Sequence, residues 1–316
     1  MNSPLPKVLT IGGPTASGKK RIALDAAERF GGEIVSADSR KVYRHLDIGT
    51  AKPSPEDRAR IPHHLIDIIE PDEPFSAGEW VRRAAGAVRD ILERGRLPII
   101  SGGTGFYIEA FREGLSEGIF PDPEVRVALE QELREKGLEA LHRRLVEVDP
   151  VRASELAVRD SVRVMRALEI YETTGRMVTE LRTLPRATGG EYDYFFIGVA
   201  MKRAELYRRI DERVDRMVRD GLVEEVRRVL AMGYDRGLVS LDTVGYKEWF
   251  PFLDGTGTFE HCMEQVKRDT RRYAKRQLTW FRNIPGIRWI DTVDGAAVDR
   301  AFEEIASWLA GEEEKS

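Results

Sequence analysis

The sequence has little of what marks secreted, membrane-spanning or zinc-binding proteins. Cys262 is the only cysteine among 316 residues, which excludes an intramolecular disulfide and a cysteine-rich zinc site. No run of about 18 apolar residues occurs, and the amino terminus passes into a strand pattern without a basic leader, so we expect neither a membrane span nor a signal peptide. We therefore expect a cytoplasmic globular protein. Hydrophobic residues make up 41% of the chain, which is enough to form a buried core.

A large excess of one charge is absent as well. The 50 basic and 54 acidic residues give a net charge of −4, so the field of the whole molecule does not attract a polyanion. Any binding of nucleic acid must therefore come from local basic surfaces.

Two stretches have the composition of such a surface. The segment 267–282 (KRDTRRYAKRQLTWFR) carries seven basic residues against one acid, Asp269. Three of them have the i, i+4, i+7 spacing of one helix face: Arg268, Arg272 and Lys275. A second set repeats this spacing in the middle of the chain: Arg159, Arg163 and Arg166. Two basic faces on different elements favour an extended polyanion over a small molecule.

Short apolar runs alternate with helical patterns at the beginning of the chain. We expect strands at 7–11, 33–36 and 97–101, and helices at 19–30 and 80–94. This alternation is typical of a parallel α/β sheet, whose ligands gather at the carboxyl ends of the strands.

The middle of the chain, from about residue 122 to 182, is expected to be entirely helical. A strand at 192–201, one long helix at 203–232, a helix at 259–281, a strand at 287–290 and a final helix complete the prediction. We therefore predict a P-loop NTPase-like parallel sheet core with an inserted all-helical subdomain. The expected parts are residues 1–120, the insertion 121–185 and residues 186–316.

The first predicted strand leads into a phosphate-binding motif. A P-loop reads G-x-x-x-x-G-K-[ST], and the segment GPTASGKK places Gly13, Gly18 and Lys19 in register. Lys20 stands where the Mg²⁺-binding hydroxyl belongs; its ammonium group cannot bind a metal, but it could neutralise phosphate charge or point to solvent. The residues expected to bind phosphate are Gly13, Pro14, Thr15, Ala16, Ser17, Gly18, Lys19 and Lys20.

Polar residues also follow the next two predicted strands. Asp38, after the strand 33–36, could hold Mg²⁺, accept a proton from a substrate amine or hydroxyl, or cap the following turn. Thr104 lies in a second glycine-rich loop, GGTG, and offers a hydroxyl where the backbone approaches a ligand.

Longer strings connect these motifs and resemble the bacterial tRNA dimethylallyltransferase family. The resemblance is collinear from about residue 7 to residue 290. It rests on GPTASGK (13–19), SADSRKVYRHLDIGTAKPS (36–54), HHLIDI (63–68), GGTGFYIEA (102–110), RALEIYETTG (166–175), VGYKE (244–248) and AKRQLTWFR (274–282).

This resemblance implies a transferase and its substrates. A dimethylallyl group would pass from dimethylallyl diphosphate to the N6 amine of adenosine 37, just 3′ of the anticodon, in tRNAs that read codons beginning with U. The P-loop would hold the diphosphate leaving group instead of ATP. The family further implies Mg²⁺ as cofactor, a monomer, and the tRNA anticodon loop as partner.

The resemblance also assigns roles to individual residues. Asp38 would be the general base, Thr104 would help to place the substrate, and Arg213 would hold the diphosphate, with Arg209 and Arg216 as neighbouring alternatives. No metal site is assigned apart from Mg²⁺ near Asp38, weakened by Lys20. The residues expected to bind tRNA are Asp38, Ser39, Arg40, Lys41, Thr104, Arg126, Val162, Arg163, Val164, Met165, Arg166, Arg272, Lys275 and Arg276.

Three departures from the family pattern keep other interpretations open. They are Lys20 in place of Thr or Ser, Lys41 where Gln is common, and residues 159–161 (Arg-Asp-Ser) where Asn-Asp-Pro is common. The alternatives are a P-loop small-molecule kinase, a tRNA-binding paralogue with reduced catalysis, and a prenyltransferase that acts on free adenine nucleotides.

Overall fold

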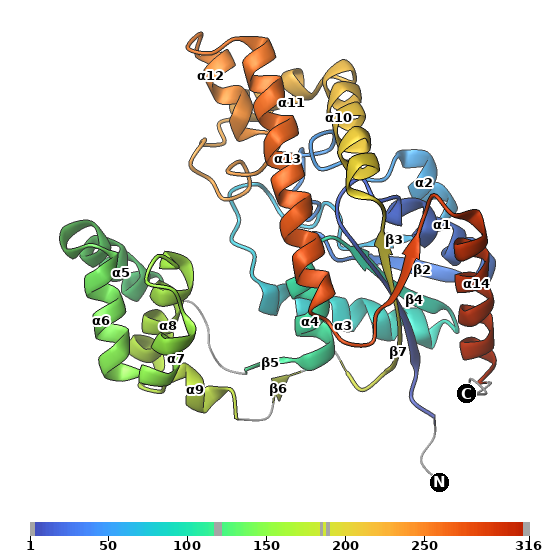
Figure 1. Ribbon diagram of the computed structural model, residues 1–316, viewed down its shortest axis with the longest axis horizontal. Helices are drawn as coiled ribbons and strands as arrows, with labels where there is room; N and C mark the ends of the chain where they lie inside the picture. The colour runs from blue at the N-terminus through green and yellow to red at the C-terminus, as the bar shows by residue number, and fades with distance from the viewer. Residues whose placement is uncertain (1–3, 117–121, 184–185, 188–189, 312–316) are drawn as a thin grey trace. The chain divides into compact units, whose positions relative to one another are not determined.

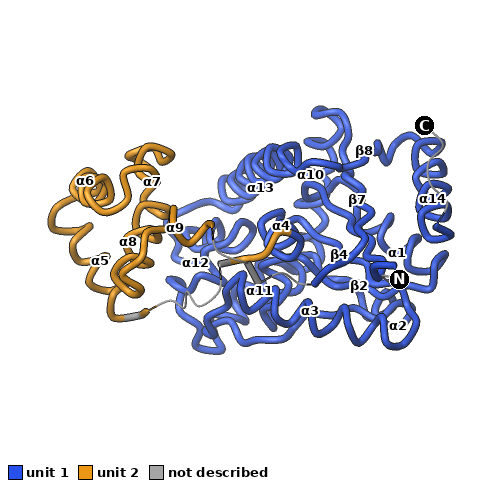
Figure 2. Tube along the Cα trace, turned by 90° about the horizontal axis from the view of Figure 1, so that it is seen from below, with its two compact units in different colours: residues 1–112, 189–316 blue, residues 113–188 orange. Residues whose placement is uncertain are grey.

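The computed structural model describes residues 4–116, 122–183, 186–187 and 190–311. The chain forms two compact units, one of residues 1–112 and 189–316, the other of residues 113–188 (Figure 2). The expected insertion, 121–185, lies inside the second unit.

The first unit is built on a six-stranded parallel sheet with the strand order β3-β2-β4-β1-β7-β8 (Figure 1). This confirms the predicted α/β class. The strand bounds are Lys7–Gly12 (β1), Gly32–Ser36 (β2), His63–His64 (β3), Leu97–Gly102 (β4), Asp193–Ala200 (β7) and Arg288–Asp291 (β8). Strand β3 was not predicted, because two residues are too few to show a periodic pattern.

Helices cover both faces of this sheet. On one face, α1 (Lys19–Phe30) and α14 (Gly295–Ala310) pack against alternate strand residues such as Leu9 and Ile197. On the other face lie α3 (Ala77–Glu93), α4 (Gly105–Glu113) and α13 (Phe259–Arg282). The Trp80 ring of α3 stacks on Tyr107 of α4 at 4.8 Å, and its Nε1 donates to the Ser36 carbonyl at 2.9 Å. This bond fixes α3 to the end of β2.

The prediction of a single long helix at 203–232 is wrong. The structure has two helices there, α10 (Arg203–Arg219) and α11 (Leu222–Ala231). Gly221 lies between them with a φ of 99°, a left-handed conformation that favours glycine and ends an α-helix. The apolar spacing continues across the break, so periodicity alone could not locate it.

A second hydrophobic core lies beside the sheet and is formed by α11, α13 and the segments between them. These segments include the 3-10 helix Lys247–Trp249 and α12 (Phe250–Leu253). Tyr246 and Trp249 are fully buried there, against Val42 and Leu46 from the loop after β2. That loop continues into the short helix α2 (Pro55–Arg60).

The second unit is a helical bundle packed around Leu141, Leu145 and Leu168. Its helices are α5 (Pro123–Lys136), α6 (Leu138–Val148), α7 (Pro150–Glu155), α8 (Ser161–Thr174) and α9 (Val178–Leu181). A two-stranded antiparallel ribbon, β5 (Leu115–Ser116) and β6 (Arg186–Ala187), lies outside the expected helical range. No helix in the described part of the chain is long and apolar enough to cross a membrane.

The prediction that Arg159, Arg163 and Arg166 lie on one face of a single helix is wrong. Helix α8 begins at Ser161, and Asp160 caps it by accepting a hydrogen bond from the Arg163 N–H at 3.2 Å. Arg159 therefore lies in the turn before the helix, where helical spacing does not apply.

Gly102 provides a test of how closely β4 and the end of β2 are packed. A Cβ at this position would lie 1.9 Å from the Ala37 carbonyl oxygen, whereas a Cβ at Gly86, inside α3, would meet no atom within 4 Å. We expect Gly102→Ala to lower the free energy of unfolding by about 1–3 kcal/mol. Gly86→Ala should raise it by about 0.5–1 kcal/mol, because alanine favours a helix. Urea unfolding of both variants measures the difference, and equal stabilities would contradict the close packing.

Candidate active site

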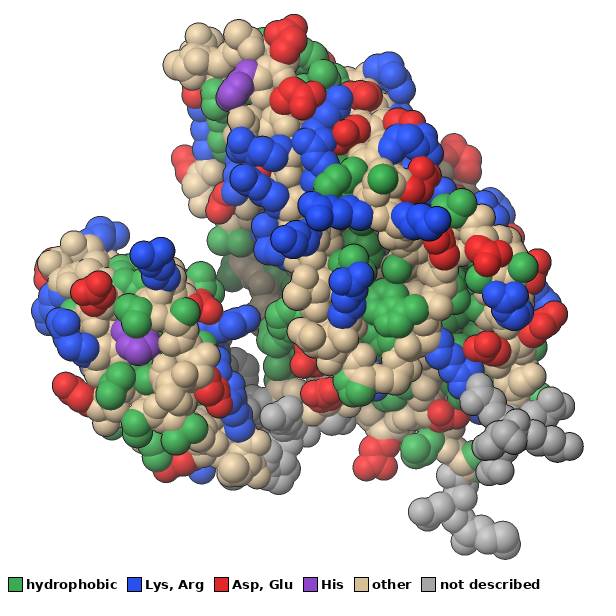
Figure 3. Space-filling model, in the orientation of Figure 1, with side chains coloured by type: hydrophobic (Ala, Val, Ile, Leu, Met, Phe, Trp, Pro, Cys, Tyr) green, Lys and Arg blue, Asp and Glu red, His purple; other side chains and the backbone are tan. Residues whose placement is uncertain are grey.

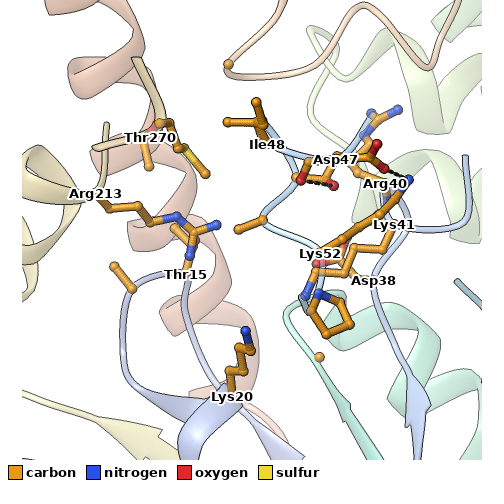
Figure 4. A pocket seen from close by; sticks show the side chains of 18 of the residues that line it. Thr15, Lys20, Asp38, Arg40, Lys41, Asp47, Ile48, Lys52, Arg213 and Thr270 are labelled. Atoms are coloured by element: carbon orange, nitrogen blue, oxygen red, sulfur yellow. Dashed lines mark hydrogen bonds and ion pairs between the residues drawn. The ribbon is translucent and has the colours of Figure 1, made fainter. Parts of the chain in front are cut away.

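Three loops meet at the carboxyl edge of the sheet. They follow β1, β2 and β4, which are neighbours in the sheet, with Gly12 paired to Gly102 and Ser36 paired to Ser101. A cavity of about 1300 Å³ opens at this edge (Figure 4). Residues 15–20 and 38–41 line it, together with residues 47–55 and side chains from α10 and α13. The three polar clusters predicted from the sequence therefore lie together.

The loop 13–20 has the backbone of an anion-binding nest. Gly18 has a φ of 93° and lies at the amino terminus of α1, where no side chain caps the helix. A Cβ at Gly13 would lie 2.5 Å from the Val199 carbonyl oxygen, so only glycine fits at the start of the loop. Uncapped N–H groups and the positive end of the helix dipole favour a phosphate here.

Half-buried cations surround this nest. Burial lowers the pKa of Lys19 to about 7, and repulsion from Lys41 adds to the effect, while Asp38 opposes it. Burial also lowers the pKa values of Lys41 and Arg213, again with Asp38 opposing the shift. The Lys19 Nζ donates to the Pro14 carbonyl oxygen at 3.1 Å. The arrangement is an electrostatic environment that a multiply charged anion would stabilise.

Lys20 has a partner of its own. Its Nζ lies 2.5 Å from the Asp57 Oδ2, and its side chain remains 47% exposed. Asp57 also takes part in the capping box of α2, where its carboxylate accepts a hydrogen bond from the Ser54 N–H at 3.2 Å. Lys20 therefore contributes to the field of the cavity from its edge, and its charge helps to lower the pKa of Lys41.

Asp38 and Thr104 are brought together by the backbone. The Ser39 N–H donates to the Thr104 Oγ1 at 3.0 Å, and the Thr104 N–H donates to the Ala37 carbonyl oxygen at 3.1 Å. Asp38 Oδ1 accepts the Arg40 N–H at 3.0 Å, so the expected turn-capping role is present. Within the described chain, Oδ2 of Asp38 accepts no protein hydrogen bond, which leaves it for a substrate.

The structure distinguishes Arg213 from its neighbours. Arg213 reaches from α10 toward the loop of Thr15 (Figure 4), whereas the Arg209 Nε donates to Glu205 Oε1 at 2.8 Å. The side chain of Arg216 is exposed. Burial in the field of Lys19 and Asp38 makes Arg213 the strongest candidate of the three for contact with an anion.

Two buried groups that the sequence analysis did not single out support the cavity walls. The Glu225 carboxylate accepts N–H groups of Asp47, Ile48 and Gly49 at 2.9–3.1 Å, and the Tyr246 hydroxyl at 2.6 Å. Gln277 of α13 joins the two glycine-rich loops. Neither position has a local signal, because each acts on backbone far away in the sequence.

Basic residues on α13 remain available at the surface (Figure 3). Arg272, Lys275 and Arg276 are exposed, and Arg272 has an ion pair with Asp269 at 3.1 Å. Tyr273 lies between them, with a pKa that burial raises to about 12.

The residues expected to contact tRNA in the helical unit differ in accessibility. Val162 is 70% exposed, but Val164 and Met165 are buried in the bundle core, so their side chains are not available to a ligand. Three arginines form ion pairs on the surface of the same unit: Arg126 with Glu130, Arg163 with Asp160, and Arg166 with Glu169.

Comparisons with known proteins give consistent results. Residues 41–284 match the family model described as IPP transferase. The chain is 47% identical over 285 residues to a tRNA dimethylallyltransferase of Geobacter sulfurreducens, covering 90% of this chain and 92% of that protein.

Two solved structures resemble the chain over nearly its whole length. The full-length tRNA isopentenylpyrophosphate transferase of Bacillus halodurans is 41% identical, with a TM-score of 0.70 over 97% of this chain and 96% of that chain. A eukaryotic dimethylallyltransferase, captured acting on tRNA, is 28% identical, with a TM-score of 0.84 over 98% of this chain and 81% of that chain.

The lowered pKa of Lys19 predicts how anion binding depends on pH. An amine with a pKa of about 7 loses its proton as the pH rises, so the cavity loses a positive charge between pH 7 and pH 8.5. In the wild type, the dissociation constant for inorganic diphosphate should therefore rise between these two pH values. In Lys19→Arg the guanidinium stays charged, so the corresponding rise should be about tenfold smaller. Calorimetric titrations at both pH values measure this ratio. Parallel pH profiles of the two proteins would rule out Lys19 as the titrating group.

Proposed function

The chain belongs to the IPP transferase family and transfers a dimethylallyl group to tRNA; from this premise we propose how its residues divide the work. The cationic cavity binds the diphosphate of dimethylallyl diphosphate, and Asp38 acts on the N6 amine of adenosine 37 in tRNAs that read codons beginning with U. The observation that carries this proposal is the cluster of half-buried cations Lys19, Lys41 and Arg213 in the cavity that also holds the carboxylate of Asp38.

The donor half of the site stabilises a leaving group. As the bond between C1 of the dimethylallyl group and the diphosphate oxygen breaks, negative charge grows on the diphosphate. The N–H groups at the start of α1 and the cations Lys19, Lys41 and Arg213 would face this charge. Fixed dipoles and charges in a desolvated site stabilise such a charge more strongly than water does.

The acceptor half removes a proton. The N6 nitrogen attacks C1, the N6–C1 bond forms while the C1–O bond breaks, and the amine proton passes to Oδ2 of Asp38. Thr104 fixes the loop that carries Asp38 through its bond to Ser39. This assignment uses the oxygen of Asp38 that the turn leaves free.

The tRNA would be held by basic side chains in each unit. Arg272, Lys275 and Arg276 lie on the helix that lines the cavity, and Arg40 and Lys41 lie in the loop of Asp38. The target base must leave the anticodon loop to reach Asp38, so phosphate contacts near the cavity are needed to hold the opened loop. On the helical unit, Arg126, Val162, Arg163 and Arg166 remain candidates for tRNA contact.

Mg²⁺ would enter with the donor. Lys20 supplies no ligand, and the described residues contain no group of three His, Cys, Asp or Glu side chains that could hold a metal. Mg²⁺ commonly binds through substrate phosphates, water and one or two carboxylates, and Asp38 is the carboxylate beside the phosphate loop. When bound, the ion would neutralise diphosphate charge, a task that the cavity lysines and Arg213 share.

Replacement of Asp38 tests the assignment of the base. We expect Asp38→Asn to lower the transfer of labelled dimethylallyl groups into unmodified tRNA at least about 100-fold, because the amide cannot accept the proton. Binding of tRNA should stay within a few fold. Asp242→Asn is the matched control, since Asp242 also lines the cavity but pairs with Lys247 at 2.8 Å, and it should retain activity.

Two results of this experiment would contradict the proposal. Transfer by Asp38→Asn within about tenfold of the wild type would exclude Asp38 as the general base. Binding of tRNA by the wild type without any transfer would favour the paralogue with reduced catalysis.

Replacement of Lys20 tests the role of the metal. The positive charge of Lys20 acts near Lys41, so we expect the wild type to keep more of its activity when Mg²⁺ is removed by a chelator than Lys20→Thr does. In Lys20→Met, which lacks both the charge and the hydroxyl, activity should depend on Mg²⁺ but need a higher concentration than Lys20→Thr. Transfer rates across a Mg²⁺ titration measure the order of the three proteins, and superimposable curves would show that Lys20 takes no part.

A further inference from the structure

Gln277 on α13 forms a bridge between the two glycine-rich loops of the site. Its Oε1 accepts the Thr15 N–H at 2.8 Å, and its Nε2 donates to the Gly103 carbonyl oxygen at 2.8 Å. The side chain is 7% exposed. One buried amide thus connects the loop that holds the diphosphate to the loop that carries Thr104.

The chemistry of both contacts requires a neutral side chain that accepts on one atom and donates on the other. A carboxylate can accept the Thr15 N–H but would place a second acceptor against the Gly103 oxygen. An apolar side chain of the same length would leave a buried N–H and a buried carbonyl without partners, and both need one. Among side chains of this length, the glutamine amide satisfies both loops.

The packing around Gln277 holds α13 close to these loops. A Cβ at Gly103 would lie 2.2 Å from the Gln277 Nε2, and a Cβ at Gly105 would lie 2.3 Å from the Trp280 ring. On the same helix, Phe281 would lie 2.5 Å from a Cβ at Gly12. The glycines of the loops therefore make room for α13, and Gln277 is the polar contact within an apolar interface.

Tyr273 interacts with both Gln277 and Asp38, the proposed general base. It lies one turn before Gln277, and its pKa is raised to about 12 by burial and by the Asp38 carboxylate, while a hydrogen bond with Gln277 acts in the opposite direction. Asp38 and Gln277 thus both act on the same phenol. Arg276, next to Gln277 in the chain, is exposed and is a candidate for tRNA contact.

We propose that Gln277 is a positioning residue: it sets the distance between the leaving diphosphate and the loop of Thr104, which in turn holds the loop of Asp38. It does so from α13, the helix that also carries the basic residues proposed to bind tRNA. The assignment rests on the proposed function for its catalytic consequence. The effect of Gln277 on the phosphate-binding loop does not rest on the proposed function. Gln277 contacts the Thr15 N–H of that loop whichever molecule accepts the transferred group.

The test replaces Gln277 by glutamate, whose side chain has the hydrogen-bonding pattern of glutamine only when it is protonated. A protonated carboxyl group accepts through its carbonyl oxygen and donates through its O–H, as the amide does. Burial and the Gly103 carbonyl oxygen both favour this protonated form of a glutamate at position 277. Of the charged groups that act on the neighbouring Tyr273, Asp38 favours the protonated form as well, whereas Arg40 and Arg276 oppose it. At pH 8 we expect Gln277→Glu to lower kcat about 10- to 100-fold, because small displacements of reacting groups have large effects on rate. Between pH 8 and pH 6 the ratio of its kcat to the wild-type kcat should rise at least about fivefold.

Gln277→Met is the matched control for packing. It keeps the length of the side chain but can neither donate nor accept to the loops, so its kcat should be low at both pH values, with a ratio to the wild type that does not change. The dissociation constant for tRNA should stay within about twofold in both variants, because Gln277 is buried. Thermal unfolding identifies any variant that does not fold.

Binding of inorganic diphosphate separates this proposal from the proposed function. Recovery of diphosphate affinity by Gln277→Glu at pH 6, but not by Gln277→Met, supports the bridge even if the wild type transferred nothing to tRNA. If folded Gln277→Glu followed the wild-type pH profile in both kcat and diphosphate affinity, Gln277 would have no positioning role. Parallel loss in Gln277→Glu and Gln277→Met at both pH values would overturn the proposal as well.

Discussion

The concentration of half-buried positive charge at the carboxyl edge of the sheet is the constraint on which the rest of the structure depends. Lys19, Lys41 and Arg213 repel one another in a site that also partly removes them from water, and Asp38 is the carboxylate that opposes their pKa shifts. Such a cluster is electrostatically unfavourable unless an anion offsets its charge. It persists because the fold fixes the surrounding backbone, and on the proposed function the unfavourable energy would become binding energy when a diphosphate enters.

The groups that fix this backbone are themselves polar and buried, but each is satisfied. Glu225 gathers three consecutive N–H groups of the loop after β2, and the Lys52 ammonium donates to the Tyr43 carbonyl and pairs with Asp47, both at 2.7 Å. Gln277 performs the same task for the two glycine-rich loops. The cations Lys19, Lys41 and Arg213 line the cavity, whereas the side chains of Glu225, Lys52 and Gln277 form hydrogen bonds with protein groups. Because these hydrogen bonds are made within the protein, they hold the backbone around the positively charged cavity in place.

The sequence predicted the parts of the site that depend on local backbone. The P-loop, Asp38 and Thr104 follow strands whose patterns are short and clear, and neighbouring parallel strands necessarily bring their ends together. Glu225 and Gln277 could not be predicted, because nothing within their own helices distinguishes them from solvent-facing residues. The break at Gly221 and the start of α8 after Arg159 were missed for a related reason, since apolar spacing does not register a single left-handed residue or a cap.

Lys20 shows how one substitution changes meaning once its surroundings are known. In the sequence it removes a metal ligand from a P-loop, which suggests a damaged site. In the fold its ammonium pairs with Asp57, a residue that also caps α2, so the charge is held at the rim of the cavity by a partner that is itself fixed. An exposed pair of this kind contributes little to stability. Its effect is therefore on the field at Lys41 and on the phosphate loop, where a fixed positive charge and a bound Mg²⁺ act in the same direction on a diphosphate.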